Sequence, residues 1–459
     1  MLNFPTDTIA AISTPIGNGG IAIVRVSGSL AKDIARRVFV PANQKSAALK
    51  HRMMTFGHVI ATDGEPIDEA MAVIFLAPNS YTKEGVLELH CHGGSETARL
   101  TLSACLDAGA RLAEPGEFTK RAFLSGRIDL TQAEAVMRVI SSKSQKAATV
   151  SQKQLGGALA KAVIALQDEL LDIVAGIEAA ADYPEEDIAD ETARLTAQKT
   201  SCLISRLDEM LSSAKYARAL SDGIRVCIAG KPNAGKSSLM NALLGENRAI
   251  VTDIAGTTRD VLTEPLNIGG IPATICDTAG LRTEGDVIER IGIERARAEI
   301  DLCDIVLLVL DIGSELSDED LRIIALNSPE KPVILVKNKI DLLAEGDEPA
   351  FPCCENMQSV TISALKMQGI DDLRAIILRI FESSESIGDV NLTEQRHVEA
   401  VSAARISLSL ALEAIDNGLP VDVCAIDLRD AWQHLGLITG KTVNEELITR
   451  IFEKFCLGK

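Results

Sequence analysis

The chain has 459 residues, and 65 acidic against 46 basic side chains give it a formal net charge of −19. This length allows two to four domains with substantial cores, and the charge excludes a global positive field that would draw the protein to nucleic acid or to an anionic membrane. One Trp and three Tyr also argue against a broad base-stacking platform, so any contact with RNA must be local.

The cysteines and the N-terminal sequence indicate the compartment. Ten Cys without a framework spacing or a signal peptide are typical of a reduced protein, in which most of them are small core residues. No CxxC pair is present, which argues against a zinc site. No run of about 18 apolar residues predicts a membrane span. We therefore expect a cytoplasmic protein without membrane contact.

The first 125 residues or so predict a compact α+β domain. Turn residues such as Asp63-Gly64 separate short apolar runs. The runs are typical of strands, and they cover residues 20–26, 70–76 and 86–90.

Two histidines flank a cysteine at residues 90–92. Alternation along a strand would place Cys91 on the other face, so the three side chains would not converge on a metal ion. We predict a turn here that leads into Gly93-Gly94.

The hydrophobic period changes at about residue 131. Residues 131–134, Thr-Gln-Ala-Glu, have the pattern of a capping box at a helix N-terminus. A second helix is predicted from Thr196 to about Leu220. Between residues 134 and 196, apolar residues recur every three or four positions, which predicts a long helix in the core of a bundle. These apolar residues are Leu155, Leu159, Val163, Leu166, Leu170, Val174 and Ile177.

A phosphate-binding motif follows the helical region. Residues 230–237, Gly-Lys-Pro-Asn-Ala-Gly-Lys-Ser, fit the pattern G-x-x-x-x-G-K-[ST]. In this motif backbone N–H groups surround the phosphates, Lys236 reaches the β and γ oxygens, and Ser237 ligates Mg²⁺. The apolar run 224–229 predicts a buried strand before the motif, and residues 238–244 predict a helix whose N-terminal dipole favours phosphate.

Three further guanine-nucleotide motifs follow in the order that a working site requires. Residues 277–280, Asp-Thr-Ala-Gly, end an apolar run, where a carboxylate can meet Mg²⁺ and an N–H can meet the γ-phosphate, as in a nucleotide-state switch. Asn338 and Asp341 follow another predicted strand, and a carboxylate there can accept both N–H groups of a guanine edge, which adenine lacks. Residues 363–365, Ser-Ala-Leu, complete the set. The sequence therefore predicts GTP rather than ATP.

Helical patterns resume beyond a predicted linker at residues 383–388. One bundle with an inserted GTPase domain is the simplest arrangement, because an inserted domain needs only adjacent termini; two separate bundles are the alternative. We thus predict a multidomain chain with an N-terminal α+β domain, a central helical bundle and an inserted α/β Ras-like P-loop GTPase domain. The predicted domains are residues 1–125, the first helical part 126–222, the GTPase domain 223–382 and the second helical part 383–459.

Several specific segments lie where a generic GTPase domain does not explain them. Outside the GTPase domain they are residues 14–17, 19–20, 25–28, 88, 92–94, 115–118, 121–123, 129–130, 133–135 and 455–459. Residues 252–260, inside the GTPase domain, form one more such segment. With these segments the chain closely resembles, from end to end, the MnmE (TrmE) family of tRNA wobble-uridine modification GTPases.

The resemblance implies an activity and a set of partners. It implies a GTPase that acts with a flavoprotein of the MnmG (GidA) type, as a heterotetramer. Together they would convert C5 of the wobble uridine (position 34) of certain tRNAs to an aminomethyl or carboxymethylaminomethyl derivative. It also implies a homodimer joined through the N-terminal domains and a folate site in those domains.

The GTPase signature itself points to hydrolysis that depends on a cation. Leu281 follows the second motif, where many GTPases use Gln to orient the attacking water. Asn233 offers a side-chain carbonyl, and the loop 252–258 offers backbone and hydroxyl oxygens. Such oxygens can replace the hydration shell of K⁺ and place a positive charge where an arginine finger would otherwise lie.

The resemblance assigns these ligands and the remaining nucleotide contacts residue by residue. Glu289 would orient the water, although the residues alone favour a solvated surface charge there. The implied metal ligands are Asn233, Thr252, Ile254 and Thr257 for K⁺, and Ser237 and Thr258 for Mg²⁺. The predicted GTP contacts are Asn233, Ala234, Gly235, Lys236, Ser237, Ser238, Thr252, Asp253, Ile254, Ala255, Gly256, Thr257, Thr258, Asp277, Thr278, Ala279, Gly280, Asn338, Lys339, Asp341, Ser363, Ala364 and Leu365.

The implied folate is 5-formyltetrahydrofolate or a related one-carbon folate, with Arg25, Glu88, Arg127 and Lys459 as candidate contacts. A carboxylate suits the donor edge of a pterin, and cations suit the glutamyl tail or the formyl carbonyl. The usual family residue at position 127 is Lys, so Arg127 offers a bidentate contact in place of a point charge. Taken alone, Arg25 and Glu88 also fit ordinary strand positions. Cys456 is either a nucleophile or a residue that packs beside the folate.

Two other functions stay open from the residues. One is a non-enzymatic G-protein switch that assists ribosome or complex assembly, with hydrolysis only timing release. A switch of this kind has no need of Arg25, Glu88 or the C-terminal tetrapeptide. The other is a folate-dependent enzyme that acts on a small molecule under GTP regulation, and dependence of the product on tRNA separates it from the family activity.

Overall fold

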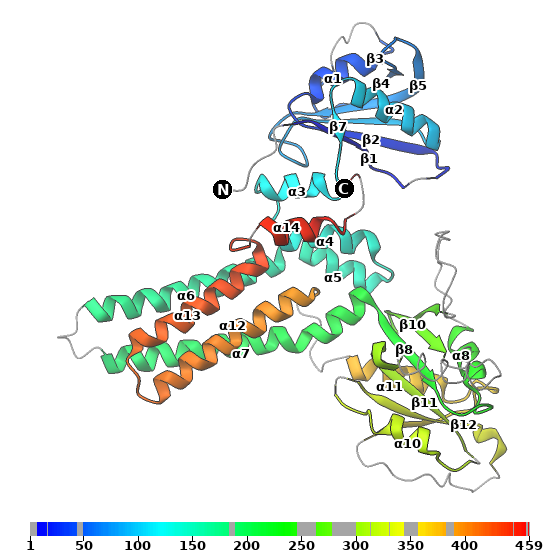
Figure 1. The fold of residues 1–459 in the computed structure, drawn as a ribbon, viewed down its shortest axis with the longest axis vertical. Helices are drawn as coiled ribbons and strands as arrows, with labels where there is room; N and C mark the ends of the chain where they lie inside the picture. The colour runs from blue at the N-terminus through cyan, green and yellow to red at the C-terminus, as the bar shows by residue number, and fades with distance from the viewer. Residues whose placement is uncertain are drawn as a thin grey trace, which may run out of the picture. The chain divides into compact units, whose positions relative to one another are not determined.

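The protein is described here from a computed structural model, which covers residues 7–15, 17–43, 49–182, 189–245, 263–277, 300–312, 314–329, 331–343, 357–381, 390–443, 445–455 and 458 (Figure 1). The chain divides into two compact units. The first unit contains Met1–Met137, Leu155–Ala179 and Leu428–Lys459, and the second contains Arg138–Gln154 and Ala180–Asp427.

A seven-stranded sheet forms the N-terminal part of the first unit. Its strand order is β3-β4-β5-β6-β2-β1-β7, and every pair is antiparallel except β1 with β7. The strands are β1 (Ile9–Ile12), β2 (Ile21–Ser27), β3 (Phe39–Pro41), β4 (Thr55–Ile60), β5 (Pro66–Phe75), β6 (Val86–His92) and β7 (Arg111–Leu112).

A six-stranded sheet forms the nucleotide-binding part of the second unit, in the order β13-β12-β11-β8-β10-β9. All its pairs are parallel except β9 with β10. The strands are β8 (Ile224–Ala229), β9 (Thr263–Ile268), β10 (Ile271–Asp277), β11 (Ile305–Asp311), β12 (Val333–Asn338) and β13 (Gln358–Thr361).

Figure 1 labels most of the helices of the two units. In chain order they are α1 (Ala31–Val38), α2 (Ser95–Asp107), α3 (Glu117–Leu124), α4 (Leu130–Ser141), α5 (Gln145–Leu155), α6 (Ala158–Asp182), α7 (Ala189–Asp222), α8 (Lys236–Leu244), α10 (Asp318–Ile324), the 3₁₀ helix η2 (Ile340–Leu342), α11 (Ile370–Phe381), α12 (Gln395–Asp416), α13 (Val421–Thr439) and α14 (Glu445–Phe452).

Alternation along β2 gives the N-terminal sheet two different faces. Val24 and Val26 belong to a buried core that also contains apolar residues of α1 and α2. Arg25 therefore lies on the opposite face. On that face Phe118 of α3 packs with Ile9 of β1. Helices α1 and α2 thus cover one face of the sheet, and the other face carries α3 and polar side chains such as Arg25.

The C-terminal helix α14 returns to the N-terminal part of the chain within the first unit. Phe452 and Phe455 are buried in a cluster with Leu130 of α4, and Phe123 of α3 packs against it. Gly116 makes this approach possible, because a β-carbon there would lie 2.8 Å from Cβ of Phe455. Burial of these apolar side chains provides the main driving force for holding the C-terminus in place.

Alternation along β8 also separates two cores in the second unit. Val226 faces a cluster formed with apolar residues of α8 and α11, whereas Cys227 faces a cluster that includes α10. Val150 of α5 and Leu220 of α7 belong to the first of these clusters. Part of the helical region therefore shares a hydrophobic core with the nucleotide-binding sheet.

The helix start predicted at residues 131–134 is wrong by two residues. Asp129 caps α4, since the Gln132 N–H donates to its side chain at 3.0 Å and the Asp129 N–H donates to the Gln132 side chain at 3.1 Å. Thr131 is buried inside the helix. An ionised Asp is a strong acceptor for helix N–H groups, and it precedes the apolar face by one residue.

The predicted apolar stripe is divided between two helices. Leu155 ends α5, Gly157 adopts a left-handed backbone at φ 81°, and the stripe from Leu159 onward lies in α6. A hydrogen bond of 3.0 Å from Gln167 to the Trp432 carbonyl joins α6 to α13, as the adjacent ribbons in Figure 1 show. The predicted linker at residues 383–388 lies outside the described residues, and the boundaries of the three predicted domains stay a prediction.

The predicted turn at residues 90–92 is also wrong, because β6 continues to His92 through its pairing with β2. Cys91 is buried on the helix-covered face, as alternation predicts. His90 instead lies 3.4 Å from Glu88, and His92 lies 2.7 Å from Asp68. Among the described residues, no group of three or more His, Cys, Asp or Glu side chains is placed to hold a metal ion.

Candidate functional site

The phosphate-binding loop joins β8 to α8. Gly230 begins the loop at φ 135°, where a β-carbon would lie 2.3 Å from the Val309 carbonyl oxygen of β11. Lys236 is 7% exposed, and its ammonium donates to the carbonyls of Gly230 at 2.9 Å and Lys231 at 2.7 Å. The loop therefore curves around a cation at the N-terminus of a helix, an arrangement that favours phosphate.

Asn338 connects three of the predicted motifs. Its side-chain amide donates to the Ala234 carbonyl at 2.8 Å, and its side-chain carbonyl accepts from the Ala364 N–H at 3.0 Å. A β-carbon at Gly235 would lie 2.1 Å from the amide nitrogen of Asn338, so this close approach requires glycine. The phosphate loop, the β12 end and the Ser-Ala-Leu segment thus form one hydrogen-bonded site.

Asp341 is oriented by the same segment. The Ser363 hydroxyl donates to its carboxylate at 2.6 Å, and this hydrogen bond is the main reason that the pKa of Asp341 lies below its ordinary value. Lys339 is held in a left-handed conformation and pairs with Asp311 at 2.5 Å. An ionised, oriented carboxylate can accept two N–H donors from one base edge.

The remaining predicted nucleotide and metal contacts are only partly described. Asn233, Ser237 and Ser238 are exposed on the phosphate loop and the first turn of α8, and Leu365 is exposed beside the Asn338 site. The backbone of Asp277 ends β10 beside Ile228 of β8. Residues 252–258, 278–280, Leu281 and Glu289 lie outside the described residues. The exposed oxygens of Asn233 and Ser237 suit K⁺ and Mg²⁺ respectively.

A second site lies on the face of the N-terminal sheet opposite α1 and α2. Arg25 and Glu88 are cross-strand neighbours, and the guanidinium donates to the carboxylate at 2.9 Å. Arg25 also lies 5.7 Å from the ring centre of Phe118, and Arg127 lies 4.6 Å from that of Tyr81. The structure thus brings together three residues that are distant in sequence.

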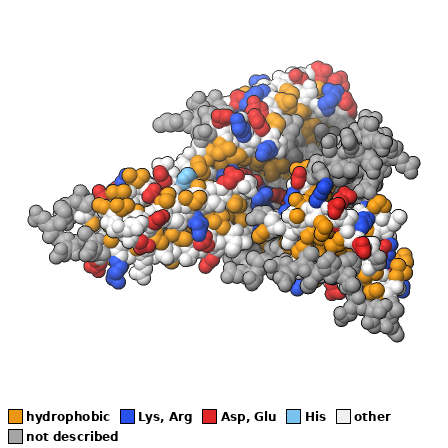
Figure 2. Space-filling model, turned by 60° about the horizontal axis from the view of Figure 1, so that its bottom comes forward, with side chains coloured by type: hydrophobic (Ala, Val, Ile, Leu, Met, Phe, Trp, Pro, Cys, Tyr) orange, Lys and Arg blue, Asp and Glu red, His pale blue; other side chains and the backbone are white. Residues whose placement is uncertain are grey.

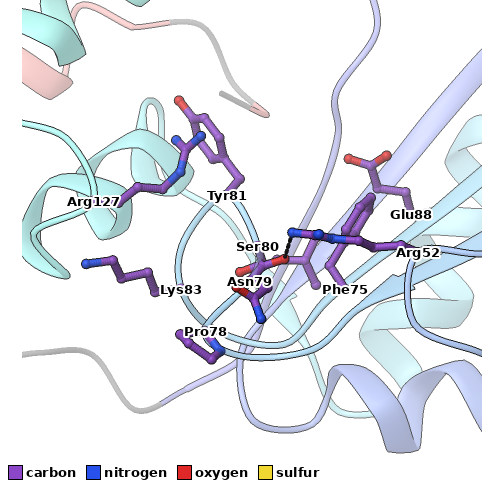
Figure 3. Close-up of a pocket in the computed structure, with 10 residues that line it drawn as sticks. Arg52, Phe75, Pro78, Asn79, Ser80, Tyr81, Lys83, Glu88 and Arg127 are labelled. Carbon is purple, nitrogen blue, oxygen red and sulfur yellow. Dashed lines mark hydrogen bonds between the residues drawn. The ribbon is translucent and has the colours of Figure 1, made fainter. Parts of the chain in front are cut away.

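Three of these side chains, Glu88, Tyr81 and Arg127, border a cavity of about 450 Å³ (Figure 3). Glu88 and Arg127 line it together with Phe75, Tyr81, Arg52 and Lys83. Its size and its mixture of aromatic walls and a few charged groups are typical of a small-molecule site. Sequence reasoning missed Tyr81, Arg52 and Lys83, because no local pattern connects them with Glu88 or Arg127.

The C-terminus reaches the same sheet. Gly458 adopts φ 86°, its carbonyl accepts from the Ser13 hydroxyl at 3.0 Å, and a β-carbon there would lie 2.1 Å from the Ile12 carbonyl oxygen. Ile12 pairs with Val24, the residue beside Arg25 in β2. Cys456 and Lys459 themselves lie outside the described residues.

A buried charge network supports this region, and sequence reasoning assigned it no role. Arg121 of α3 is fully buried and bonds to Glu117 at 2.8 Å, to Asp7 at 2.7 Å and to Glu84 at 3.1 Å. Burial raises the pKa of Glu117, but hydrogen bonds from Arg111, the Glu114 N–H and Arg121 outweigh it and bring the pKa below its ordinary value. The network fixes α3 on the sheet.

Basic and acidic side chains are interspersed over the described residues visible in Figure 2. That face shows no continuous basic area among them. Among the described residues, no helix combines the length and apolar composition that a membrane crossing requires.

The central sheet, with its phosphate loop after β8 and its Asn338–Asp341 segment, defines a P-loop GTP-binding domain within a multidomain chain. Two family models match the chain: "GTP-binding protein TrmE N-terminus" over residues 8–127 and "MnmE helical domain" over residues 130–456.

Curated relatives extend this match over almost the whole length. The tRNA modification GTPase MnmE of Ligilactobacillus salivarius (strain UCC118) is 43% identical and the alignment covers 99% of this chain and 98% of that protein. The same-named protein of Geobacillus kaustophilus (strain HTA426) is 44% identical over 99% of each chain. Among solved structures, Era of Aquifex aeolicus bound to GDP·AlF₄⁻ is 30% identical over 41% of this chain and 67% of that chain, with a TM-score of 0.29. The chain belongs to the MnmE (TrmE) family of tRNA modification GTPases, which confirms the predicted family and fold class.

Proposed function

We propose that this protein is a potassium-activated GTPase that modifies tRNA in the cytoplasm. With a flavoprotein of the MnmG type, it converts C5 of the wobble uridine of certain tRNAs to an aminomethyl or carboxymethylaminomethyl derivative. The observation that carries the proposal is the extent of the similarity to tRNA modification GTPases, which covers 99% of the chain rather than the nucleotide-binding domain alone. An assembly switch needs no such N-terminal domain.

The G-domain geometry supports the hydrolytic half of this function. Lys236 and the N–H groups of the phosphate loop hold the phosphates, and Asp341 and Asn338 hold the guanine. Asn233, Thr252, Ile254 and Thr257 bind K⁺, while Ser237 and Thr258 bind Mg²⁺. When bound, these ions neutralise the charge that develops on the transferred phosphoryl group. Glu289 orients the attacking water.

The N-terminal cavity supports the tRNA-modifying part of the proposed function. Its aromatic walls suit the planar pyrimidine ring of a reduced pterin, and Glu88 offers an acceptor for the donor edge of that ring. Arg25, Arg127 and Lys459 supply cations for the anionic or carbonyl groups of a 5-formyltetrahydrofolate. A bound folate of this type supplies a one-carbon unit. Cys456 has two candidate roles, as a nucleophile and as a packing residue.

The assembly is a homodimer joined through its N-terminal domains, and it forms a heterotetramer with the flavoprotein. Such a dimer places two copies of each site in one particle. The guanine-nucleotide state can then be communicated between protomers through a shared interface.

Nucleoside analysis of tRNA tests the proposed function. Cells that lack this chain should contain wobble uridines without the aminomethyl-type group at C5. A plasmid that encodes the intact chain should restore the group, and Lys236→Ala should not. Normal wobble nucleosides in the deletion strain would contradict the proposal.

A further inference from the structure

Three cations line the N-terminal cavity together with Glu88, whose carboxylate pairs with Arg25. They are Arg52, Lys83 and Arg127, and all three are exposed. Figure 3 shows Lys83 and Arg127 on one side of the cavity and Arg52 with Glu88 on the other. The chain as a whole carries a net charge of −19, so a local excess of positive charge is a specific feature of this site.

None of these three cations pairs with a carboxylate of the described residues. Arg52 donates to the Asn79 carbonyl at 3.4 Å, and Lys83 donates to the Ser125 carbonyl at 3.0 Å. Arg127 lies over the ring of Tyr81 at 4.6 Å. Carbonyls and a ring orient a cation without neutralising it, so each keeps its charge for a ligand.

The backbone presents two of these side chains in an uncommon conformation. Arg52 has φ 59° and Lys83 has φ 62°, in the left-handed region that residues other than glycine seldom adopt. The Arg52 N–H donates to the Ile74 carbonyl at 2.9 Å, which ties its turn to β5. Strained positions of this kind often occur at ligand sites, where the surrounding structure compensates for the strain.

A folate with a single glutamate does not require all of these groups. Its tail carries two carboxylates, and each glutamate added through a γ-linkage contributes one more. Glu88 is already neutralised by Arg25 and suits the pterin end of the ligand. Arg127 can pair with the first glutamate, which leaves Arg52 and Lys83 for carboxylates farther along a longer tail.

We propose that Arg52 and Lys83, with Arg127, bind the tail of a folate that carries several γ-linked glutamates, and so select this form over the monoglutamate. This inference rests on the folate site of the proposed function and specifies which folate that site prefers. The three cations act as specificity-determining residues rather than catalytic ones.

Calorimetry on the full-length protein tests this preference with 5-formyltetrahydrofolate as its monoglutamate and as its triglutamate. The triglutamate should bind several-fold more tightly at low salt, and the difference should shrink as salt screens the exposed charges. Arg52→Gln and Lys83→Gln should each weaken triglutamate binding about two- to fivefold, the range of exposed ion pairs, while monoglutamate binding changes less than twofold.

Arg36→Gln provides the matched control, because Arg36 is an exposed arginine of α1 outside the cavity. It should change neither affinity, and all three variants should unfold at the wild-type temperature. Equal affinities for the two folates, or variants that weaken both equally, would overturn the selection of the tail while leaving the folate site in place. Failure of wild type to bind either folate would overturn the folate part of the proposed function and this inference with it.

Discussion

Asn338 shows how one side chain can organise a nucleotide site. Its amide reaches the phosphate loop and its carbonyl reaches Ala364, while the side chain itself is only 3% exposed. Asn338 is therefore a buried residue that holds the phosphate loop and the Ser-Ala-Leu segment together. The nearby Asp341 then needs only the Ser363 hydroxyl to fix its direction.

We expect hydrolysis to depend on K⁺ through Asn233. The apolar side chain of Leu281 cannot orient water, and in the proposed mechanism K⁺ held by oxygens of residues 252–258 would supply a positive charge at the phosphates. Steady-state GTPase rates should be high in KCl and low in NaCl, and Asn233→Ala should be slow in both. GTP binding should survive the change, and Asn417→Ala, at the exposed end of α12, should behave as wild type. Equal rates in the two salts would contradict the cation model.

Glu289→Ala should slow hydrolysis while leaving GTP affinity nearly intact. A residue that positions water acts in the transition state and contributes little to ground-state binding. The expected loss in single-turnover rate is about 10²- to 10⁴-fold. Asp286→Ala removes a carboxylate three positions away and serves as the control. A Glu289→Ala rate within about twofold of wild type would return Glu289 to the role of a surface charge.

At the scale of elements, α3 is held by buried charges as well as by the apolar contacts of Phe118 and Phe123. Arg121 has no exposure and reaches three carboxylates from three separate segments. Its neighbour Phe118 packs on β1 from the same helix. Removing a single carboxylate should therefore be costly.

Glu117→Gln should lower the free energy of unfolding of the first unit by on the order of 3 kcal/mol, because it leaves Arg121 buried beside one fewer charge. The pKa of Glu117 is lowered in the folded state, so its contribution is complete above its ordinary pKa of about 4.3 and is lost as pH falls through the folded-state value. Calorimetry should thus show a deficit near pH 7 that narrows on acidification. Glu114→Gln, an exposed carboxylate on the same turn, should show little deficit. An equal loss of unfolding free energy at pH 7 and at acidic pH would contradict this linkage.

Gly458→Ala should weaken folate binding. A β-carbon there would meet the Ile12 carbonyl, and the left-handed backbone costs an L-residue roughly 1–2 kcal/mol, which corresponds to about 5- to 30-fold in affinity. GTPase activity should be nearly unchanged. Gly64→Ala is the control, because Gly64 has φ 89° with no neighbour within 4 Å of a β-carbon. Equal folate affinity in wild type and Gly458→Ala would show that the C-terminus does not build the site.

At the scale of the whole molecule, the second unit joins part of the helical region and the sheet of β8 in one hydrophobic core. Val150 of α5 and Leu220 of α7 share one core with β8 and with Ile268 and Ile271 of the β9–β10 hairpin. Gly270 in that hairpin approaches the Lys146 side chain of α5. A shift of the hairpin would thus press directly on helices outside the nucleotide-binding sheet.

We expect the G domains of the dimer to meet only with a transition-state mimic. A cation site completed by loop closure stabilises whichever arrangement shields it from water, and two G domains can shield each other. Small-angle scattering should show a more compact particle with GDP, aluminium fluoride and K⁺ than with GDP alone. Na⁺ in place of K⁺ should abolish the change. Identical scattering in the GDP and mimic states would argue against association.

The sequence alone determined the features whose residues are neighbours in the chain. Residues 224–229 form β8 as predicted, and the phosphate loop and α8 follow at once, because a buried apolar run, glycines and a helix start act within a few residues of one another. The order of the four guanine motifs likewise required no knowledge of packing.

Only the tertiary structure decided which distant residues share a site. Asp129 rather than Thr131 caps α4, and pairing with β2 keeps residues 90–92 in a strand. Arg52 and Lys83 join Glu88 around one cavity, and Gly458 returns to Ile12. These outcomes depend on strand register and on burial of apolar surface between segments far apart in the chain. A local sequence pattern specifies neither of them.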